Sequence, residues 1–225
     1  MTVVAHDTVF LFDVDDTLLD NDRVKEDLKE KVLHDFGQDA SDRFWVIYEE
    51  QRKKHIYADF IGTLELFRLE HMHNPQALRL SLWMMDYPFA ERLFPDALAV
   101  VRHVSQWGLP VILTDGDGVF QPYKLERAGL WNAFDGRVLG YIQKDKELDA
   151  IERAYPAKHY VLVDDKLKVL NTIKGIWGNR VTTVFVKQGH YANDPNVLAS
   201  EPAADVSVDR VGELMMHDFS TIRAD

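Results

Sequence analysis

Two carboxylates stand two positions apart where an apolar run of the chain ends. Asp13 and Asp15 lie in the segment DVDDT (residues 13–17), directly after the apolar residues 9–12. At a strand end, where the chain leaves a sheet, acids at positions i and i+2 can both be directed at one site. Their repulsion must then be offset by a bound cation or a shared proton. The segment therefore indicates a site that handles charge.

A second pair of acids, Asp164 and Asp165, follows another apolar run. Four carboxylates at two predicted strand ends, in a chain without cysteine, favour Mg²⁺ over zinc because Mg²⁺ prefers oxygen ligands. Thr114 ends a third apolar run, and a lysine, for which Lys144 is the first choice, lies between it and the second acid pair. A hydroxyl and an ammonium beside Mg²⁺ are suited to the oxygens of a phosphoryl group.

These residues need a scaffold that brings distant parts of the chain together. Short, continuously apolar runs are typical of parallel strands buried on both faces. They occur at residues 9–12, 111–113, 160–163, 182–186 and, more weakly, 206–208. In open α/β sheets, ligands bind beyond the carboxyl ends of the strands. The polar clusters that follow four of these runs are therefore expected to converge.

Apolar residues at helical spacing fill the intervals between the runs. Residues 97–107 and 166–177 each stop at a glycine, and residues 145–155 stop at a proline. Residues 20–94 differ, because they are rich in charged residues, leucine and aromatics and contain no buried strand run. This interval predicts two or more helical hairpins inserted after the first strand. The fold class is therefore α/β.

In combination, the segments FDVDDTLLD and LTDGD, Lys144 and the segment VLVDD resemble the four ordered motifs of the haloacid dehalogenase (HAD) superfamily of hydrolases. The resemblance covers the whole core. It implies a Rossmann-like three-layer core with a parallel sheet, formed by residues 1–19 and 94–225. Residues 20–93 take the place of the α-helical cap that is inserted after the first motif in the C1-type subgroup.

The resemblance also implies a role for each motif residue. Asp13 would be the nucleophile that forms an aspartyl-phosphate, and Asp15 the general acid/base that protonates the leaving group and then activates water. Thr114 would bind a phosphoryl oxygen, and Lys144 would neutralise the phosphate and position Asp13. The implied substrate-binding residues are Thr114, Asp115, Gly116 and Lys144. The implied Mg²⁺ ligands are Asp13, Asp15 through its main-chain carbonyl, Asp164 and Asp165.

The chain departs from the family pattern at two places. The third motif usually has Lys followed by Pro, whereas residues 143–146 are Gln-Lys-Asp-Lys, so Lys146 competes with Lys144. Lys144 is preferred because a helix is expected to begin directly after it. The last motif has Val169 where an acid would stand four residues after Asp165. Metal binding must then rely on the adjacent acid pair.

The acid at Asp15 favours one branch of the superfamily. Members that displace halide lack this acid, since they have no leaving-group oxygen to protonate. The resemblance thus implies a Mg²⁺-dependent phosphatase that acts on small phosphomonoesters. A phosphomutase or phosphotransferase with the same chemistry is the alternative. A receiver-like regulatory domain, which accepts phosphate on an aspartate without turnover, is an alternative from another class. The long insertion argues against it, because a receiver encloses no substrate.

Composition restricts the partners. The 26 basic and 37 acidic residues leave a net charge of −11, which opposes binding to nucleic acid or to an anionic membrane. Without cysteine, the chain has no disulfides and no thiolate catalysis. No targeting segment and no run of about 20 apolar residues is present, so a cytoplasmic location is expected. The expected partner is a small phosphorylated metabolite, and the oligomeric state stays open.

Several other polar residues are interpreted as structural. Asp16 and Asp20 are expected to be solvated or to cap a helix. Asp117 is assigned to a turn, and Lys124 to the surface of a helix. The charged run at residues 51–55 is interpreted as a solvated helix face.

Overall fold

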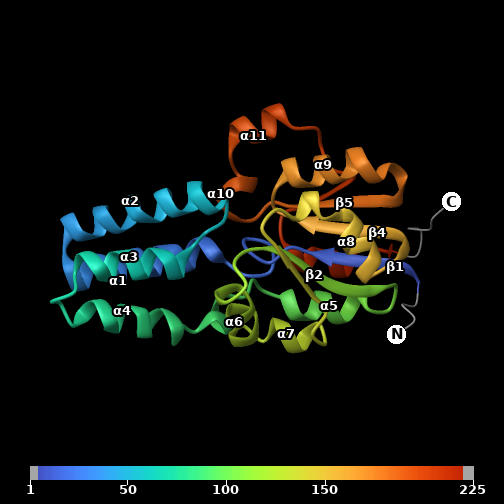
Figure 1. The fold of residues 1–225 in the computed structure, drawn as a ribbon. Coiled ribbons are helices and arrows are strands. Elements are labelled where there is room, and N and C mark those ends of the chain that lie inside the picture. Colours follow the sequence, from blue (N-terminus) through green and yellow to red (C-terminus); the bar gives the residue numbers. More distant parts are fainter. Residues whose placement is uncertain (1–4, 220–225) are drawn as a thin grey trace.

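A parallel sheet forms the centre of the molecule, and a group of helices extends to one side of it (Figure 1). The computed structural model describes residues 5–219, and within them the sheet has six strands in the order β3-β2-β1-β4-β5-β6. The strands are β1 (His6–Phe12), β2 (Leu109–Asp115), β3 (Val138–Tyr141), β4 (Ala157–Asp164), β5 (Val181–Val186) and β6 (Val206–Val208). The predicted α/β, Rossmann-like class is confirmed. The outer ends of the predicted core, residues 1–4 and 220–225, lie outside the described residues.

Strand β1 lies between β2 and β4, and its alternating side chains enter two different cores. Phe10 and Phe12 belong to one buried cluster, and Val9 and Leu11 to another. Both faces of the sheet are therefore covered, which explains why this strand is continuously apolar in the sequence. The covering helices include α5 (Ala97–Val104), α6 (Phe120–Arg127), α7 (Leu130–Ala133), α8 (Leu148–Ala154) and α9 (Leu167–Trp177).

The sequence does not predict β3. This strand is at the edge of the sheet, it has only four residues, and Gly140 is one of them. None of its side chains is fully buried, so it lacks the continuous apolar run of the inner strands. Helix boundaries also differ from expectation, since α5 ends at Val104 and α8 begins at Leu148.

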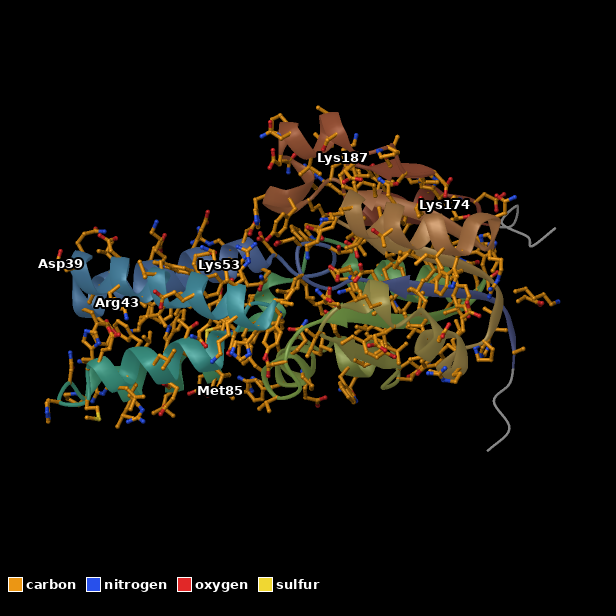
Figure 2. All side chains as sticks on the ribbon, turned by 45° about the horizontal axis from the view of Figure 1, so that its top comes forward. Asp39, Arg43, Lys53, Met85, Lys174 and Lys187 are labelled. Carbon is orange, nitrogen blue, oxygen red and sulfur yellow. The ribbon has the colours of Figure 1, made fainter. Side chains whose placement is uncertain are left out.

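Residues 21–85 fold into four helices arranged as two hairpins beside the sheet (Figures 1 and 2). Side chains fill the space between them. Among these, the buried Phe44 and Phe67 pack edge to face. At the surface, Arg43 on one helix pairs with Glu70 on another. The helices are α1 (Asn21–Phe36), α2 (Gln38–His55), α3 (Phe60–Glu70) and α4 (Gln76–Met85), followed by the short turn η1 (Phe89–Arg92). Among residues 5–219, none of the helices has the length and apolar character to span a lipid bilayer.

The chain enters and leaves this helical group through two paired segments. Leu19 and Leu93 form an antiparallel bridge. The amide of Asp20 donates to the carbonyl of Arg92 at 2.8 Å, and the amide of Phe94 donates to the carbonyl of Leu18 at 2.9 Å. The four helices are therefore connected to the sheet through a narrow two-stranded junction directly above the end of β1.

Asp27 on α1 ties the helical group to this junction. Its carboxylate accepts hydrogen bonds from the Tyr87 hydroxyl and from Arg92 Nε and Nη2, the latter two at 3.0 and 2.8 Å. Burial opposes ionisation, but the contacts with Tyr87 and Arg92 outweigh it and hold the pKa of Asp27 below its ordinary value of 3.8. The carboxylate is thus a charged anchor at neutral pH.

Replacing Asp27 with Asn is expected to lower the free energy of unfolding by about 1–3 kcal/mol at pH 7, because hydrogen bonds to a charged group are lost. A lowered pKa gives stabilisation that is present above the unfolded-state value and lost as pH falls through the folded-state value. The difference from wild type should therefore shrink below about pH 4. Urea unfolding at pH 7 and pH 3 measures this, with Glu30→Gln on the same helix as the control. An equal cost at both pH values contradicts the prediction.

Candidate active site

The predicted polar clusters meet at the carboxyl edge of the sheet. Asp13 follows β1, Thr114 lies at the end of β2, and Asp164 ends β4. Because β1 is paired with both β2 and β4, these ends are neighbours. Lys144 arrives from the short turn η2 (Lys144–Lys146), which follows β3. Segments separated by up to 151 residues, the difference between positions 164 and 13, therefore form one site.

Lys144 is the central cation of the site. Its Nζ lies 2.5 Å from Asp13 Oδ1 and 2.7 Å from Asp164 Oδ2, and the side chain is 1% exposed. Burial alone would lower the pKa of Lys144, but Asp13 and Asp164 raise it above its ordinary value. Lys146 is exposed to solvent. Of the two competing lysines, the structure thus brings Lys144 to Asp13.

Asp13 is almost completely buried. Burial raises its pKa to about 6, against the opposing charge of Lys144. Its second oxygen, Oδ2, accepts a weak hydrogen bond from Thr17 Oγ1 at 3.3 Å. Lys144 and Lys166 therefore offset the effect of burial only in part, and a further cation would favour the ionised carboxylate.

Asp165 shows where such a cation fits. Both of its side-chain oxygens are buried, and neither has a hydrogen-bond partner in the described part of the chain. Burial raises the pKa of Asp165 well above its ordinary value. Carboxylate oxygens of Asp13, Asp164 and Asp165 lie within 4.8 Å of one another. This oxygen-only donor set suits a hard divalent cation such as Mg²⁺.

Lys166, which sequence reasoning did not single out, also faces this group. Burial would lower its pKa, but Asp165 and Asp13 raise it above the ordinary value. Its ammonium lies 5.2 Å from the centre of the Tyr191 ring. The lysine stands directly after the predicted acid pair, so its place in the segment DDK was the available signal.

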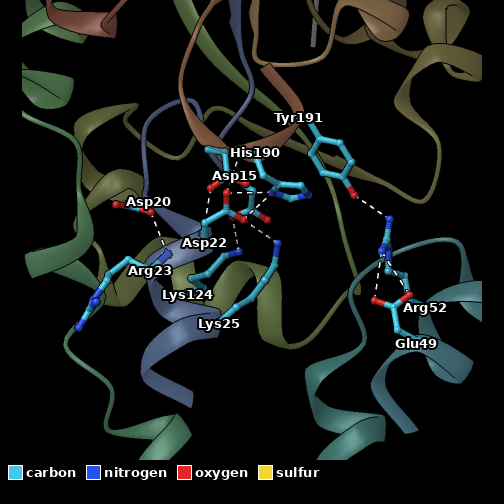
Figure 3. Close-up of polar contacts among 11 residues, drawn as sticks. Asp15, Asp20, Asp22, Arg23, Lys25, Glu49, Arg52, Lys124, His190 and Tyr191 are labelled. Atoms are coloured by element: carbon cyan, nitrogen blue, oxygen red, sulfur yellow. Dashed lines mark hydrogen bonds and ion pairs between the residues drawn. The ribbon is translucent and has the colours of Figure 1, made fainter. Parts of the chain in front are cut away.

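The assignment of Lys124 to a helix surface is wrong. Its side chain is 2% exposed, and its Nζ lies 2.5 Å from Asp15 Oδ1 (Figure 3). Helix α6 packs this face against the carboxyl edge of the sheet, so the lysine points inward. The carboxylate of Asp15 is thereby turned toward Lys124, and it is not part of the cluster formed by Asp13 and the acid pair after β4.

The residues at the end of β2 have distinct surroundings. Thr114 is 1% exposed, and its hydroxyl oxygen accepts a hydrogen bond from Gln121 Nε2 at 2.8 Å. Asp115 accepts a hydrogen bond from the main-chain amide of Lys144 at 2.7 Å, and burial raises its pKa. Its carboxylate therefore fixes the start of η2. Gly116 lines the adjoining cavity.

Two acids of the first motif region support helix α1. Asp20 Oδ1 accepts from the amide of Arg23 at 2.9 Å, as an N-cap does. Asp16 Oδ1 accepts from the amide of Asp22 at 3.0 Å. Of the two expectations for Asp16, the structure shows the cap and not solvation, since Asp16 contacts the first turn of α1 and is only 2% exposed; a Cβ added to the neighbouring Gly189 would approach the Asp16 Cβ to 2.5 Å.

A cavity of about 850 Å³ separates this site from the helical group. Residues from the sheet edge line one side, and helices α1 and α2 provide much of the other. The residues from the sheet edge and the adjoining α6 include Asp15, Asp115, Gly116, Lys124 and Lys166, and those from the helical group include Lys25, Trp45, Tyr48, Arg52 and Tyr57. The predicted solvated face at residues 51–55 holds for Lys53 and Lys54, which are exposed, but Arg52 faces the cavity.

Two contacts close the cavity at one side (Figure 3). Arg52 Nη2 donates to the Tyr191 hydroxyl at 2.7 Å. Asp22 accepts a hydrogen bond from the amide of His190 at 2.7 Å. Both partners come from helix α10 (Gly189–Ala192), which follows β5. The cavity is therefore bordered by the helical group, by the sheet edge and by this short helix.

The sequence and the fold were compared with those of known proteins. No protein-family model and no curated protein matches the chain. A solved haloacid dehalogenase-like hydrolase from Burkholderia xenovorans LB400 is 51% identical, with a TM-score of 0.88 over 95% of this chain and 97% of that one. A HAD hydrolase from Bacillus subtilis bound to magnesium has a TM-score of 0.61 at 15% identity, over 93% and 97% of the two chains.

A 2-haloacid dehalogenase from Pseudomonas syringae pv. Tomato DC3000 has a TM-score of 0.60 at 15% identity, over 92% of this chain and 96% of that one. At this identity the last two structures show a shared fold alone. The Burkholderia protein shares half of its residues with this chain over nearly the full length of both. With the motif residues gathered at one sheet edge, the chain therefore belongs to the haloacid dehalogenase-like hydrolases.

Proposed function

We propose that the protein is a Mg²⁺-dependent phosphatase that hydrolyses small phosphomonoesters through an aspartyl-phosphate on Asp13. The position of Asp15 carries the proposal. It lies two residues from Asp13, it lines the cavity, and Lys124 holds one of its oxygens. An acid in this position has a use where a leaving-group oxygen must be protonated, and none where halide leaves.

The residues of the site can divide the reaction between them. A carboxylate oxygen of Asp13 attacks phosphorus, the ester P–O bond breaks, and Asp15 transfers a proton to the departing oxygen. In the second half, Asp15 takes a proton from a water molecule that attacks phosphorus and releases Asp13. Lys144 offsets the repulsion between Asp13 and the phosphate, and Thr114 donates to a phosphoryl oxygen.

Asp13, Asp164 and Asp165 are the residues that would hold Mg²⁺, because their oxygens are clustered and those of Asp165 lack partners. When bound, the ion would supply positive charge that offsets the repulsion between the carboxylate and the phosphate. The walls formed by α1 and α2 act as the cap, and the cavity of about 850 Å³ accommodates a small phosphorylated metabolite. A receiver-like domain has no use for such an enclosure.

Magnesium is expected to stabilise the protein through Asp165. Binding at a hundredfold excess over Kd adds about 2.7 kcal/mol to the unfolding free energy. In Asp165→Asn this gain should be lost, while the metal-free variant stays at least as stable as wild type because a buried carboxylate whose oxygens lack hydrogen-bond partners is removed. Thermal unfolding with and without Mg²⁺ measures both effects. Asp149→Asn, an exposed acid on α8, is the control. A full Mg²⁺ effect in Asp165→Asn would show that the ion binds elsewhere.

The reaction class is tested by a screen of phosphomonoesters and 2-haloacids with Mg²⁺, in which released phosphate and halide are measured separately. The Asp13→Asn variant serves as the blank. We expect phosphate release from at least one phosphomonoester and no halide release. Halide release without phosphate release would identify a dehalogenase. Isomerised sugar phosphate without free phosphate would identify a mutase, and a stable phosphoprotein without turnover would identify a regulatory domain.

A further inference from the structure

Helix α6 directs two buried polar side chains at two residues of the proposed site. Gln121, 5% exposed, donates from Nε2 to Thr114 Oγ1 at 2.8 Å. Lys124 lies 2.5 Å from Asp15 Oδ1. Positions i and i+3 share one face of a helix, so a single helix face contacts both groups. Neither Gln121 nor Lys124 belongs to the four motifs.

The bond from Gln121 determines what the Thr114 hydroxyl can do. A hydroxyl has one donor and two acceptor positions, and the amide N–H of Gln121 occupies an acceptor position. The hydroxyl hydrogen stays available. Within the described residues its acceptor is the carbonyl of Asp115 at 3.4 Å, well beyond the usual 2.5–3.0 Å for O–H···O. A phosphoryl oxygen beside Thr114 would therefore be the better acceptor.

The loop after β2 fixes Gln121 in this position. A Cβ added to Gly116 would lie 2.9 Å from Gln121 Cβ, so only glycine permits the approach. Asp117 Oδ1 accepts from the amides of Val119 and Phe120, at 2.8 and 2.6 Å, and so fixes the start of α6. The turn assigned to Asp117 from the sequence thus also anchors the helix.

We propose that helix α6 is the positioning element of the site, in which Gln121 aims the Thr114 hydroxyl at the phosphoryl group and Lys124 orients the carboxylate of Asp15. This inference rests on the proposed function for the identity of the bound group. In this inference, one face of α6, which lies outside the four motifs, orients both Thr114 and Asp15.

The central test is Gln121→Glu, because a carboxylate can only accept and would draw the Thr114 hydroxyl away from the ligand. We expect inorganic phosphate, titrated by calorimetry in the presence of Mg²⁺, to bind about tenfold more weakly, which corresponds to about 1.4 kcal/mol. Gln121→Met, of similar size and without either function, should have a smaller effect. In the Thr114→Val background Gln121→Glu should change binding little. Circular dichroism verifies that each variant is folded.

The added charge of Gln121→Glu is controlled by the same background. If charge repulsion alone weakens phosphate binding, the loss will be equal with and without Thr114→Val, and the inference is overturned. Equal losses for Gln121→Glu and Gln121→Met also overturn it. A loss that depends on Thr114 supports it.

The second test concerns Lys124. Lys124→Met is expected to lower kcat about 10²-fold, within the range for general acid–base catalysis, and Lys124→Arg should restore part of it. In the Asp15→Asn background Lys124→Met should cause no further loss, and an additive loss overturns this part.

Phosphate binding is measured without turnover. If wild type hydrolyses no phosphomonoester but Gln121 and Thr114 remain coupled in binding, the proposed function fails while the role of α6 stands.

Discussion

Asp13→Asn is expected to abolish turnover, with kcat lowered about 10⁴-fold or more, because an amide cannot replace the attacking carboxylate. The structure places this carboxylate next to Lys144 and within the cluster of oxygens suited to Mg²⁺. Burial raises the pKa of Asp13 to about 6, and added positive charge at the site would lower it and so favour the ionised nucleophile. Phosphate release measures the loss, and mass spectrometry of the quenched enzyme detects the phosphorylated aspartate in wild type.

Matched variants separate chemistry from structure. Asp20→Asn removes a carboxylate at the N-cap of α1 and is expected to keep most of the activity. Asp13→Ala should be as inactive as Asp13→Asn, which shows that the loss does not depend on the replacing side chain. If folded Asp13→Asn retained near-wild-type phosphate release, the nucleophile would have to be a different residue.

Lys144→Met is expected to have the second large effect, on stability as well as activity. The lysine contacts Asp13 and Asp164 in a buried site, and its removal leaves two carboxylates without their cation. Breaking a buried ion pair in this way costs about 3–5 kcal/mol. Chemical unfolding in the absence of Mg²⁺ measures the cost, and the phosphatase assay measures the loss of activity.

The Lys144→Met cost should depend on pH. Without the lysine the pKa of Asp13, already raised to about 6 by burial, rises further. A raised folded-state pKa gives stability that is present at low pH and lost as pH rises through that value. The variant should therefore be closer to wild type at about pH 5 than at about pH 8. Lys146→Met, at an exposed position two residues away, should stay within about 0.5 kcal/mol of wild type at both. A larger effect from Lys146→Met would reverse the assignment.

The inner strands were predictable because burial on both faces of the sheet leaves a continuous apolar run in the sequence of each strand. Both faces of β1 and β4 are buried, so residues 9–12 and 160–163 form apolar runs that are visible in the sequence. β3 could not be predicted in this way, since as an edge strand it buries little of its four residues. Helix ends moved by a few residues where turns such as η2 replaced regular helix.

The motif acids and Thr114 were predictable because each lies at the end of a strand that could be recognised, whereas Lys144 follows β3, which could not, and was chosen because a helix was expected to begin directly after it. Lys124 and Gln121 were not predictable, since each lies in an ordinary amphipathic helix and only tertiary packing shows which face is inside. Lys124 is 109 residues from Asp15 in sequence. No spacing rule connects the two positions, and a lysine on a helix is usually solvated. The face of α6 became evident only from its packing against Gly116.

The paired junction at Leu19 and Leu93 has a consequence for how such a protein can change. Because the chain returns to the point it left, residues 21–92 could be excised and the gap spanned by a short turn, without displacing β1. Much of one wall of the cavity is therefore encoded by a single uninterrupted stretch of the gene, the cassette for residues 21–92. Recombination could exchange this cassette between related genes while the strands that carry Asp13, Thr114 and Asp164 stay intact.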